Sequence, residues 1–361
     1  MSTMNRRHFL YSCGAATAGL ALPRVSRAMA ASEAGEWRTF EVTTGVEVLK
    51  PAGHTRVWLP LPLTSATSYQ EALGNTFRAD GGKAREERAA GAAMLIADWP
   101  EGVRPVLTLT SRVRTRDRAT DFSDGPGGKA SDHGELARYL EPSASIPTGG
   151  IVKATSDQAV KGATTDREKA RAIYEWIVDN TFRDPKVKGC GRGDILFMLE
   201  SKNLGGKCAD LNALYVGLAR AAGLPARDVY GLRLVKSQKG FQSLGPATDN
   251  VTKAQHCRAE VHLKDLGWVP VDPADVRKVV LEEPPGNRPL DDELVRRART
   301  QLFGSWEMNW MAFNYAHDVA LPGSKGPAIA YFMYPEGETA AGRLDHLDPD
   351  AFKYTISARE L

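Results

Sequence analysis

The sequence predicts an α+β protein in which an all-β region precedes a domain of helices followed by strands. Short β-rich runs bounded by Gly and Pro fill residues 36–118, where no helical period appears. Apolar residues then recur at helical spacing after Thr165 and after Cys208. Strand-like runs follow between residues 227 and 273. Because the helices precede a group of strands instead of alternating with them, the pattern favours α+β over a Rossmann-type arrangement.

The first predicted domain, residues 36–118, is a β-sandwich. Its strands are expected over residues 39–48, 56–59, 93–99 and 106–113, each of which is rich in β-branched or aromatic residues and ends at a turn. No internal repeat or low-complexity tract interrupts this region.

The rest of the chain divides at changes of composition. Residues 119–150 are rich in Gly, Ser, Asp and Pro, which predicts a linker. Residues 151–335 then form the predicted second domain. The C-terminal tail, residues 336–361, contains a last expected strand over 352–357 that packs back on the fold.

Three helices of the second domain carry their own start signals. Thr165 to Glu168 has capping-box spacing, and Asp194 precedes a short helix over 195–199. The third helix begins at Cys208 and ends at Gly223 and Pro225. Its apolar residues share one face, as expected for a helix that packs on a core.

Composition excludes several classes of protein. Hydrophobic residues are 42% and charged residues 25% of the 361 residues, which are ordinary globular values. A net charge of +3 gives no basic field of the kind that nucleic-acid binding needs. The four cysteines lack CxxC spacing, so neither a structural zinc site nor a disulfide framework is expected.

Residues 1–30 are typical of an export signal. They contain no acid, begin with the Arg6–Arg7 pair and continue into an apolar stretch, 13–22, that is too short to span a membrane. Ala28-Met29-Ala30 provides a cleavage site, and the whole resembles a twin-arginine signal peptide. The segment holds four arginines, so its removal lowers the formal charge from +3 to −1. We expect a periplasmic or secreted protein that does not span the membrane.

Cys208 is the candidate nucleophile. It is the first residue of a predicted helix and follows two glycines, which would allow a tight turn and leave room for a substrate. The free N–H groups and the positive end of the helix dipole favour a thiolate at this position. On its own, a cysteine at a helix start is more often a small buried hydrophobe.

His256 and Asp272 are the candidate base and orienting carboxylate. A hairpin whose loop centres on Lys264 places His256 opposite Asp272, with Arg258 opposite Pro270 and Glu260 opposite Trp268. An odd loop keeps these side chains on one face and leaves Cys257, Ala259 and Val261 on an apolar face that suits a core. An even loop would put Asp272 on the opposite face from His256.

The sequence leaves two alternatives to these roles open. His262 shares the nominal face of His256 but falls at the loop, where we expect a solvated turn residue. Asp275 could replace Asp272, although it lies beyond Pro273 and outside the paired register. Glu260 is expected to be a surface carboxylate or a support for the site.

These residues also carry a family resemblance. Gly205-Gly206-Lys207-Cys208-Ala209-Asp210, Gln255-His256 with Glu260-Val261, and Gly267-Trp268-Val269-Pro270-Val271-Asp272-Pro273 resemble the bacterial transglutaminase-like superfamily over about residues 150–280. That resemblance implies a circularly rearranged papain fold, with Cys208 as nucleophile, His256 as general base and acid, and Asp272 as orienting carboxylate. Arg258 departs from it, because relatives often carry a bulky aromatic there, and implies a positive charge near the cleft.

The implied chemistry is acyl transfer from a peptide or isopeptide amide, possible substrates including cell-wall peptides, through a thioester on Cys208. The Cys208 N–H is the expected first oxyanion donor, and Trp176 or Asn203 are candidates for the second, against core and turn roles respectively. Hydrolysis is favoured over cross-linking by a true transglutaminase. A binding or scaffold protein without turnover is the alternative from another class. No cofactor or metal motif appears.

The remaining motifs receive plainer interpretations. Cys190 and Cys257 are expected to be buried thiols, with a disulfide between them, or between Cys190 and Cys208, as the alternative in an oxidising compartment. The aromatic run 306–315 is expected to be core or cleft wall before a carbohydrate platform. Asp291 to Glu293 are interpreted as acids at a helix start.

Overall fold

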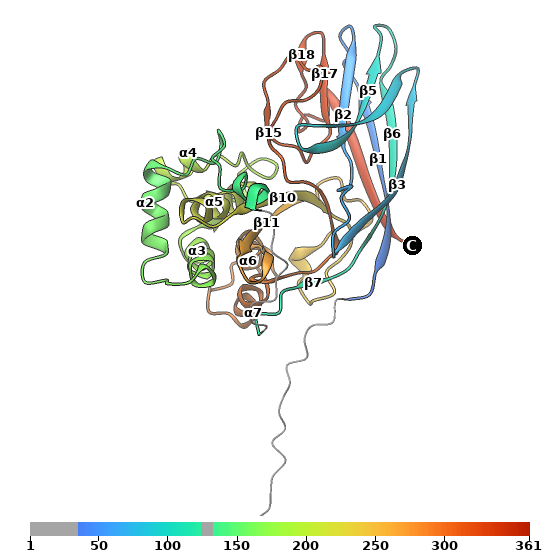
Figure 1. Cartoon of the computed structure of the whole chain (residues 1–361). Helices are drawn as coiled ribbons and strands as arrows, with labels where there is room; N and C mark the ends of the chain where they lie inside the picture. The colour runs from blue at the N-terminus through green and yellow to red at the C-terminus, as the bar shows by residue number, and fades with distance from the viewer. Residues whose placement is uncertain (1–34, 124–132) are drawn as a thin grey trace, which may run out of the picture. The chain divides into compact units, whose positions relative to one another are not determined.

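The computed structural model describes residues 35–123 and 133–361, and residues 34–361 form one compact unit (Figure 1). The predicted signal peptide lies outside the described residues. Two sheets build the sandwich. The first has the order β19-β1-β6-β3 and the second has the order β18-β17-β2-β5-β4. Their strands are β1 (Arg38–Val48), β2 (Thr55–Pro60), β3 (Gln70–Asp80), β4 (Lys83–Ala89), β5 (Ala92–Trp99), β6 (Val106–Thr115), β17 (Glu336–Thr339), β18 (Gly342–Arg343) and β19 (Phe352–Glu360).

The space between the two sheets is filled by apolar side chains. Buried and exposed residues alternate along much of β6, so that Leu107 and Leu109 face inward. Val57 and Leu59 of β2 meet them from the other sheet. The four expected strands are present, but the sandwich is not confined to residues 36–118, because β17, β18 and β19 also belong to its sheets.

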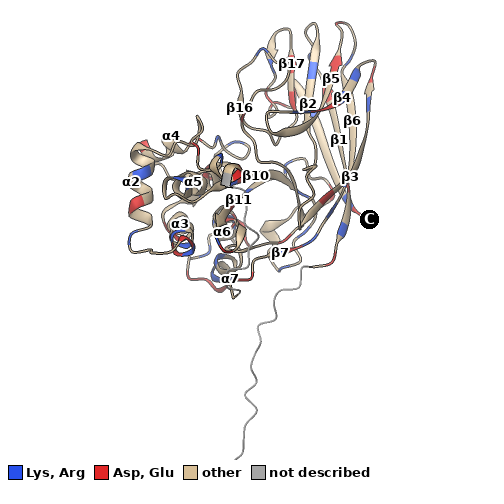
Figure 2. Ribbon diagram, in the orientation of Figure 1, with Lys and Arg blue, Asp and Glu red and all other residues tan. Residues whose placement is uncertain are grey.

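The structure contains two strands, β3 and β4, that the sequence did not predict. β3 is largely exposed and β4 carries Lys83, Arg85, Glu86, Glu87 and Arg88, so neither has the apolar alternation that marks a strand. Both lie at the edge of a sheet. Charged side chains on an edge discourage pairing with another chain, which explains a strand made of polar residues (Figure 2).

The C-terminal segment belongs to the sandwich. β19 pairs antiparallel with β1, from Phe40 opposite Glu360 to Val48 opposite Phe352, and β17 pairs with β2. The expected last strand is present and is longer than the sequence indicates, because its outer residues are polar and its pairing with β1 holds them.

The second part of the fold contains the helices. They are α1 (His133–Ala137), α2 (Gly150–Ala159), α3 (Asp166–Asn180), α4 (Ile195–Glu200), α5 (Cys208–Ala221), α6 (Pro273–Glu282), α7 (Glu293–Gln301) and the short 3-10 turn η1 (Gln242–Leu244). The three predicted helices correspond to α3, α4 and α5. Among the described residues, no helix combines the length and the apolar character needed to cross a membrane.

The helix starts confirm the local signals. The Thr165 side chain accepts a hydrogen bond from the Glu168 N–H, and the Glu168 carboxylate accepts one from the Thr165 N–H. Together these bonds form the expected capping box. The Asp194 side chain caps α4. α7 begins at Glu293 with Asp292 as its cap, so the acids there are helix-start residues as expected.

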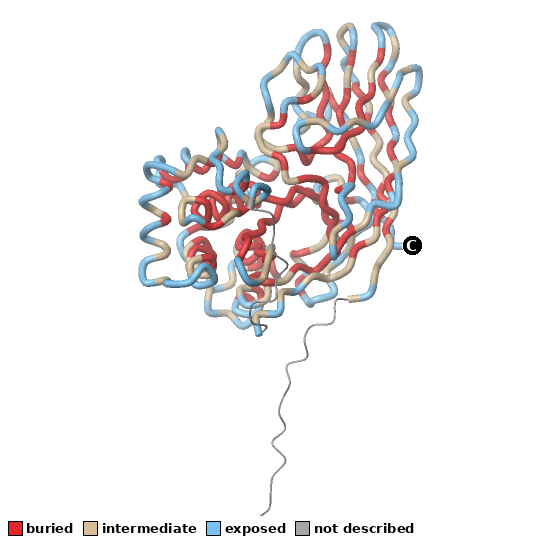
Figure 3. Tube along the Cα trace, in the orientation of Figure 1, coloured by how far each residue is buried: buried red, intermediate tan, exposed pale blue. Residues whose placement is uncertain are grey.

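A four-stranded sheet, β12-β11-β10-β14, lies at the centre of this part. Its strands are β10 (Ala226–Arg233), β11 (Gln255–Leu263), β12 (Gly267–Val271) and β14 (Trp310–Asn314). Every residue of β10 and β11 is buried (Figure 3). α5 packs against β11 and β10, while Val229 of β10 packs with Trp306 and Trp310. The aromatic run is therefore core, as expected.

Residues 119–150 are not a free linker in their described part. Tyr139 and Ile146 are buried, and the Ile195 N–H donates to the Ser145 carbonyl.

Short strand pairs complete the fold. They are β7 (Arg118–Ala119) with β13 (Ser305–Trp306), β8 (Phe182–Arg183) with β9 (Gly205–Gly206), and β15 (His317–Val319) with β16 (Ile329–Tyr331).

Candidate active site

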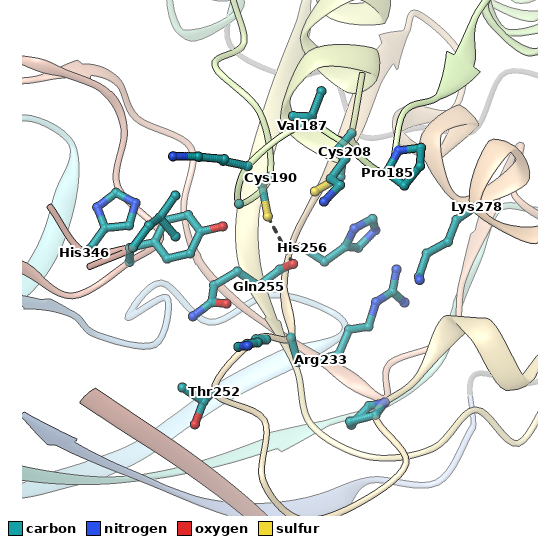
Figure 4. Close-up of a pocket in the computed structure, with 18 of the residues that line it drawn as sticks. Pro185, Val187, Cys190, Cys208, Arg233, Thr252, Gln255, His256, Lys278 and His346 are labelled. Carbon is teal, nitrogen blue, oxygen red and sulfur yellow. Dashed lines mark hydrogen bonds between the residues drawn. The ribbon is translucent and has the colours of Figure 1, made fainter. Parts of the chain in front are cut away.

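Cys208 opens α5 and faces a cleft of about 870 Å³ that His256 also lines (Figure 4). The cysteine is only 3% exposed, but its position in the cleft wall leaves the sulfur within reach of a bound substrate. The predicted helix start is confirmed. The cleft is formed where the loop before α5, the start of β11 and the segment before β19 come together.

Gly205 and Gly206 do not form the tight turn that the sequence suggests. They form β9, which pairs in parallel with β8. A Cβ at Gly205 would collide with the Phe182 ring, and one at Gly206 would lie 2.5 Å from the Asp210 Cβ. The glycines are therefore required for close packing of the chain around the helix start.

The predicted hairpin is present, but its residue pairs are wrong. Ala259 lies opposite Val271, and the loop centres on Asp265, one residue later than expected. The pairing is shifted by two residues, so Asp272 stands beyond the end of β12 and caps α6. A shift of two residues preserves the alternation of side chains, which is why the faces were predicted correctly despite the wrong register.

His256 and Asp272 meet directly. His256 Nε2 lies 2.7 Å from Asp272 Oδ2, and both side chains are buried. The other oxygen of Asp272 accepts from Asn212 Nδ2 at 3.2 Å and from the Asp275 N–H at 3.1 Å. Since Nε2 is engaged by Asp272, Nδ1 is the ring nitrogen left to interact with Cys208, which lines the same cleft.

Asp275 joins the site instead of replacing Asp272. Its Oδ2 lies 3.4 Å from His256 Nε2, while Oδ1 accepts from Arg233 at 2.6 Å. The three side chains His256, Asp272 and Asp275 are close enough to hold a metal ion. Arg233 and Arg258 already supply positive charge to the two carboxylates, which disfavours an additional cation.

The Arg258 charge lies near the cleft, as expected, although Arg258 is not among the lining residues. It is buried, its Nε lies 3.6 Å from Asp272 Oδ2, and Nη1 donates to the Glu307 carbonyl at 3.0 Å. Its guanidinium lies 4.7 Å from the centre of the Trp310 ring. Burial lowers the pKa of Arg258 to about 10. Arg258 therefore acts on the site through Asp272.

The surroundings of Cys208 favour its thiolate. The neighbouring Cys190 and Cys257 thiols lower its pKa most, burial opposes them, and His256 lowers the pKa further. The net result is a pKa well below the usual value for cysteine. The pKa values of Cys190 and Cys257 rise, for Cys190 chiefly through the neighbouring Cys208 and for Cys257 chiefly through burial.

The pKa of His256 shifts in the opposite direction to that of Cys208. Burial and the charge of Arg233 lower its pKa, but Asp275 and Asp272 outweigh them and the net shift is upward. Burial and the neighbouring Asp275 raise the pKa of Asp272, whereas Arg233 and His256 hold the pKa of Asp275 low against its burial. The lowered pKa of the Cys208 thiol and the raised pKa of the His256 imidazole together favour a thiolate–imidazolium pair.

The cysteines of the described residues are free and buried, as the plainer interpretation predicts. Cys190 Sγ donates to the Gln255 carbonyl at 3.3 Å, and the Cys190 carbonyl accepts from the Ala209 N–H at 2.9 Å. Cys190 thus links the loop before α5 both to β11 and to the helix start.

Asp210 holds that loop in place and was singled out only as part of a motif. One carboxylate oxygen accepts from the N–H groups of Arg192 and Gly193 at 2.8 and 3.0 Å, and the other from Lys207 at 2.9 Å. Gly191 has a φ of +98°, and a Cβ there would collide with the Asp210 carboxylate. The Asp at the third position of a helix, after two glycines, was the available sequence signal.

Neither candidate for the second oxyanion donor lines the cleft. Trp176 packs against the core of the domain, and the Asn203 side chain accepts from the Gly205 N–H in a turn. His262 lies within β11 instead of the loop and is buried against Trp268, so the solvated-turn prediction was wrong. Glu260 is fully buried and paired with Arg227 at 2.6 Å and with Arg118, which rules out a surface position.

Two cleft residues went unrecognised in the sequence. Arg233 ends β10 and pairs with Asp275, which no local pattern indicates. Gln255 lies next to His256 and is 8% exposed, and its Nε2 has no hydrogen-bond partner within the described structure. Its position beside the candidate base was the signal that could have found it.

Comparison with known proteins agrees with this geometry. A profile of the transglutaminase-like superfamily matches residues 153–273, which contain all three candidate catalytic residues. A protein from Cytophaga hutchinsonii, provisionally described as a cysteine protease, has a similar crystal structure. It covers 90% of this chain and 99% of its own, with a TM-score of 0.52 and 14% identity. At that identity the likeness concerns the fold alone.

Two further matches were found. The periplasmic domain of TgpA from Pseudomonas aeruginosa covers 67% of this chain and 88% of its own, at 15% identity and a TM-score of 0.36. An uncharacterised protein of Haemophilus influenzae is 34% identical over 342 residues, 89% of this chain and 91% of its own length. The chain therefore belongs to the same family as the Haemophilus influenzae protein and contains a transglutaminase-like superfamily domain.

Proposed function

We propose that this protein is an exported cysteine-dependent acyl-transfer enzyme that hydrolyses a peptide or isopeptide amide. The observation that carries the proposal is that Cys208 and His256 line the same cleft while His256 Nε2 lies 2.7 Å from Asp272 Oδ2, and His256 is one of the groups that lower the pKa of Cys208. Nucleophile, base and orienting carboxylate are the parts that covalent acyl transfer requires.

In the first step, the Cys208 thiolate attacks the amide carbonyl carbon and forms a tetrahedral intermediate. The His256 imidazolium then gives its Nδ1 proton to the departing amine, the carbon–nitrogen bond breaks and a thioester remains on Cys208. Asp272 keeps the ring oriented through Nε2 and stabilises its charged form.

In the second step, His256 is neutral and accepts a proton from water as the water attacks the thioester. The carboxylic acid leaves, and the carbon–sulfur bond breaks to restore the thiolate. The first oxyanion donor in this scheme is the Cys208 N–H, at the start of α5, where helix N–H groups lack intrahelical partners.

A screen of peptides and peptidoglycan fragments, wild type against Cys208→Ala, tests the proposal. We expect mass spectrometry to find a product from the wild-type protein that the variant does not form. Turnover that survives in Cys208→Ala would contradict the thioester mechanism.

The same reaction run with a primary amine separates hydrolysis from cross-linking. Water as acceptor predicts a free carboxylate product, whereas incorporation of the amine as the main product would indicate a true transglutaminase. A folded protein that binds peptides without any turnover would support the scaffold alternative instead.

Export is part of the proposal and has its own test. The Arg6–Arg7 pair and the Ala28-Met29-Ala30 site predict cleavage and delivery by the twin-arginine route. Replacing both arginines by lysine should leave the uncleaved chain in the cytoplasm on fractionation. Unchanged export would contradict the predicted route.

A further inference from the structure

The cleft carries a concentration of positive charge that the rest of the chain does not share. Among its lining residues, seven are Lys or Arg and one, Asp345, is an acid. The whole chain has a formal charge of only +3, which includes four arginines in the predicted signal. The cleft is therefore basic within an almost neutral protein.

The lining cations are of two kinds. Arg233 pairs with Asp275, and Arg183 and Lys278 share Glu282. The remaining four form no ion pair within the described residues; they are Lys186, Lys188, Lys207 and Lys253. Three of these are exposed, so their charges are available to a ligand in the cleft.

These lysines come from two separate segments of the chain that line the cleft. Lys186 and Lys188 lie in the loop before Cys190, and Lys253 precedes β11 and His256. A substrate whose carbonyl reaches Cys208 would thus lie in a cleft to which both segments contribute positive charge.

Gln255 is the second, independent feature. It lines the cleft, is 8% exposed, and has a buried Nε2 without a hydrogen-bond partner in the described structure. The Gln255 side chain lies near Tyr354, where it opposes the rise that burial causes in the pKa of Tyr354 to about 12. A buried donor without a partner is costly, and a ligand oxygen would satisfy it.

We propose that the cleft binds an acidic peptide, with carboxylates on residues flanking the reacting amide held by Lys186, Lys188 and Lys253, and an oxygen of the same peptide accepting from Gln255 Nε2. The proposal rests on the proposed function for the place of the amide, and deepens it by naming the substrate class. Lysines attract carboxylates at long range and set specificity, while a buried amide selects position.

Binding is measured on the full chain carrying Cys208→Ala, so that turnover cannot intervene. Isothermal titration compares an Asp- and Glu-rich peptide with its Asn and Gln counterpart. We expect about tenfold tighter binding of the acidic peptide, weakening as NaCl rises from about 0.05 M to about 0.3 M. Equal binding of the two peptides would overturn the proposal.

Matched lysine variants identify the site. Lys186→Gln, Lys188→Gln and Lys253→Gln together should weaken the acidic peptide by about tenfold. The control triple, Lys161→Gln, Lys264→Gln and Lys325→Gln, removes the same charge from exposed lysines outside the cleft and should bind as before. Equal losses in both triples would reduce the effect to net charge and overturn the assignment.

Gln255→Met keeps the length of the side chain and removes the donor. It should weaken binding of the acidic peptide while leaving the salt dependence unchanged, and unaltered affinity would remove Gln255 from the site.

A linear peptide of L-residues and a peptidoglycan stem peptide, which bears similar carboxylates on a mixed backbone, distinguish two sources of this chemistry.

The two proposals can fail separately. Cys208-dependent turnover with a preference for neutral or basic peptides would overturn the substrate class and leave the enzyme intact. Lysine-dependent binding of acidic peptides without turnover by the wild-type chain would leave the charge assignment standing and remove the catalytic one.

Discussion

The sandwich and the central sheet handle charge in opposite ways. In the first sheet of the sandwich, β19-β1-β6-β3, no charged residue is buried, and Glu41 is flanked there by Arg112 and Arg359, whose side chains are 59% and 65% exposed (Figure 2). In the central sheet, Glu260 is flanked by Arg118 and Arg227, and all three side chains are at most 13% exposed. The two clusters have the same composition and different surroundings.

The difference has an energetic meaning. Exposed ion pairs contribute little, because water screens them and two long side chains must be ordered. Buried charges are costly to desolvate, so removing one partner leaves an expensive unpaired charge. The polar interior of the central sheet therefore supports the site, and the sandwich is held mainly by its apolar core.

The largest expected effect concerns activity. Cys208→Ala should reduce turnover by about 10³-fold or more, because the thioester route is removed while binding and fold remain. Turnover of the substrate found in the peptide screen measures it, with circular dichroism as the control for folding. Residual activity within about tenfold of wild type would contradict the role of Cys208.

The two glutamate clusters provide the next test. Glu260→Gln should destabilise the protein by about 3–5 kcal/mol in urea unfolding, since it leaves Arg118 and Arg227 buried without their partner. Glu41→Gln makes the same chemical change between two exposed arginines and should cost much less. Equal losses of unfolding free energy would contradict the contrast between the two regions.

Lowering the pH should destabilise the protein through the buried cluster of Glu260, Arg118 and Arg227. Burial raises the pKa of Glu260, but Arg227 and Arg118 outweigh it and the net pKa is lowered. A group with a lowered pKa contributes stability above its unfolded pKa, and that contribution is lost as pH falls through the folded value. Wild type should therefore lose more unfolding free energy on acidification than Glu260→Gln, as urea titrations at several pH values can measure.

A smaller effect is expected at the neighbouring thiol. Cys190→Ala removes the neighbouring thiol that lowers the pKa of Cys208 most, so alkylation of Cys208 by iodoacetamide should require a higher pH. His256→Ala should shift the profile in the same direction. Cys257→Ser retains a donor and serves as the matched control. An unchanged profile in Cys190→Ala would exclude this contribution of the thiol cluster.

The pH dependence of His256 has the opposite sign. Its raised pKa contributes stability that is fully present below the unfolded pKa and is lost as pH rises through the folded value. Activity that needs the thiolate–imidazolium pair should rise as Cys208 ionises and fall as His256 loses its proton. A rate profile without the alkaline fall would contradict the proton donor assigned to His256.

The smallest expected effect lies at a surface cap in the helical part. Thr165→Ala removes the acceptor of the Glu168 N–H and should cost about 1 kcal/mol of unfolding free energy without altering activity. A loss as large as that of Glu260→Gln would show that burial does not separate the two kinds of polar contact.

Local signals account for what could be predicted. The Thr165 capping box, the Asp194 cap and the start of α5 at Cys208 depend on residues within one helical turn, and all three are confirmed. Alternation of apolar residues predicted the faces of the β11–β12 hairpin. The edge strands β3 and β4 were not predicted, because polar residues exposed at an edge show no such alternation of apolar residues.

The sequence by itself determined the helix starts and the faces of the hairpin, because each depends on spacing along a few neighbouring residues. The candidates Cys208, His256 and Asp272 came from the sequence together with a family resemblance. Only the tertiary structure decided the register that makes Asp272 a helix cap, the approach of Asp275 and Arg233 to His256, and the assembly of lysines and Gln255 around Cys208. Those contacts join segments far apart in the chain, and burial and charge between them arise only when the core brings those segments together.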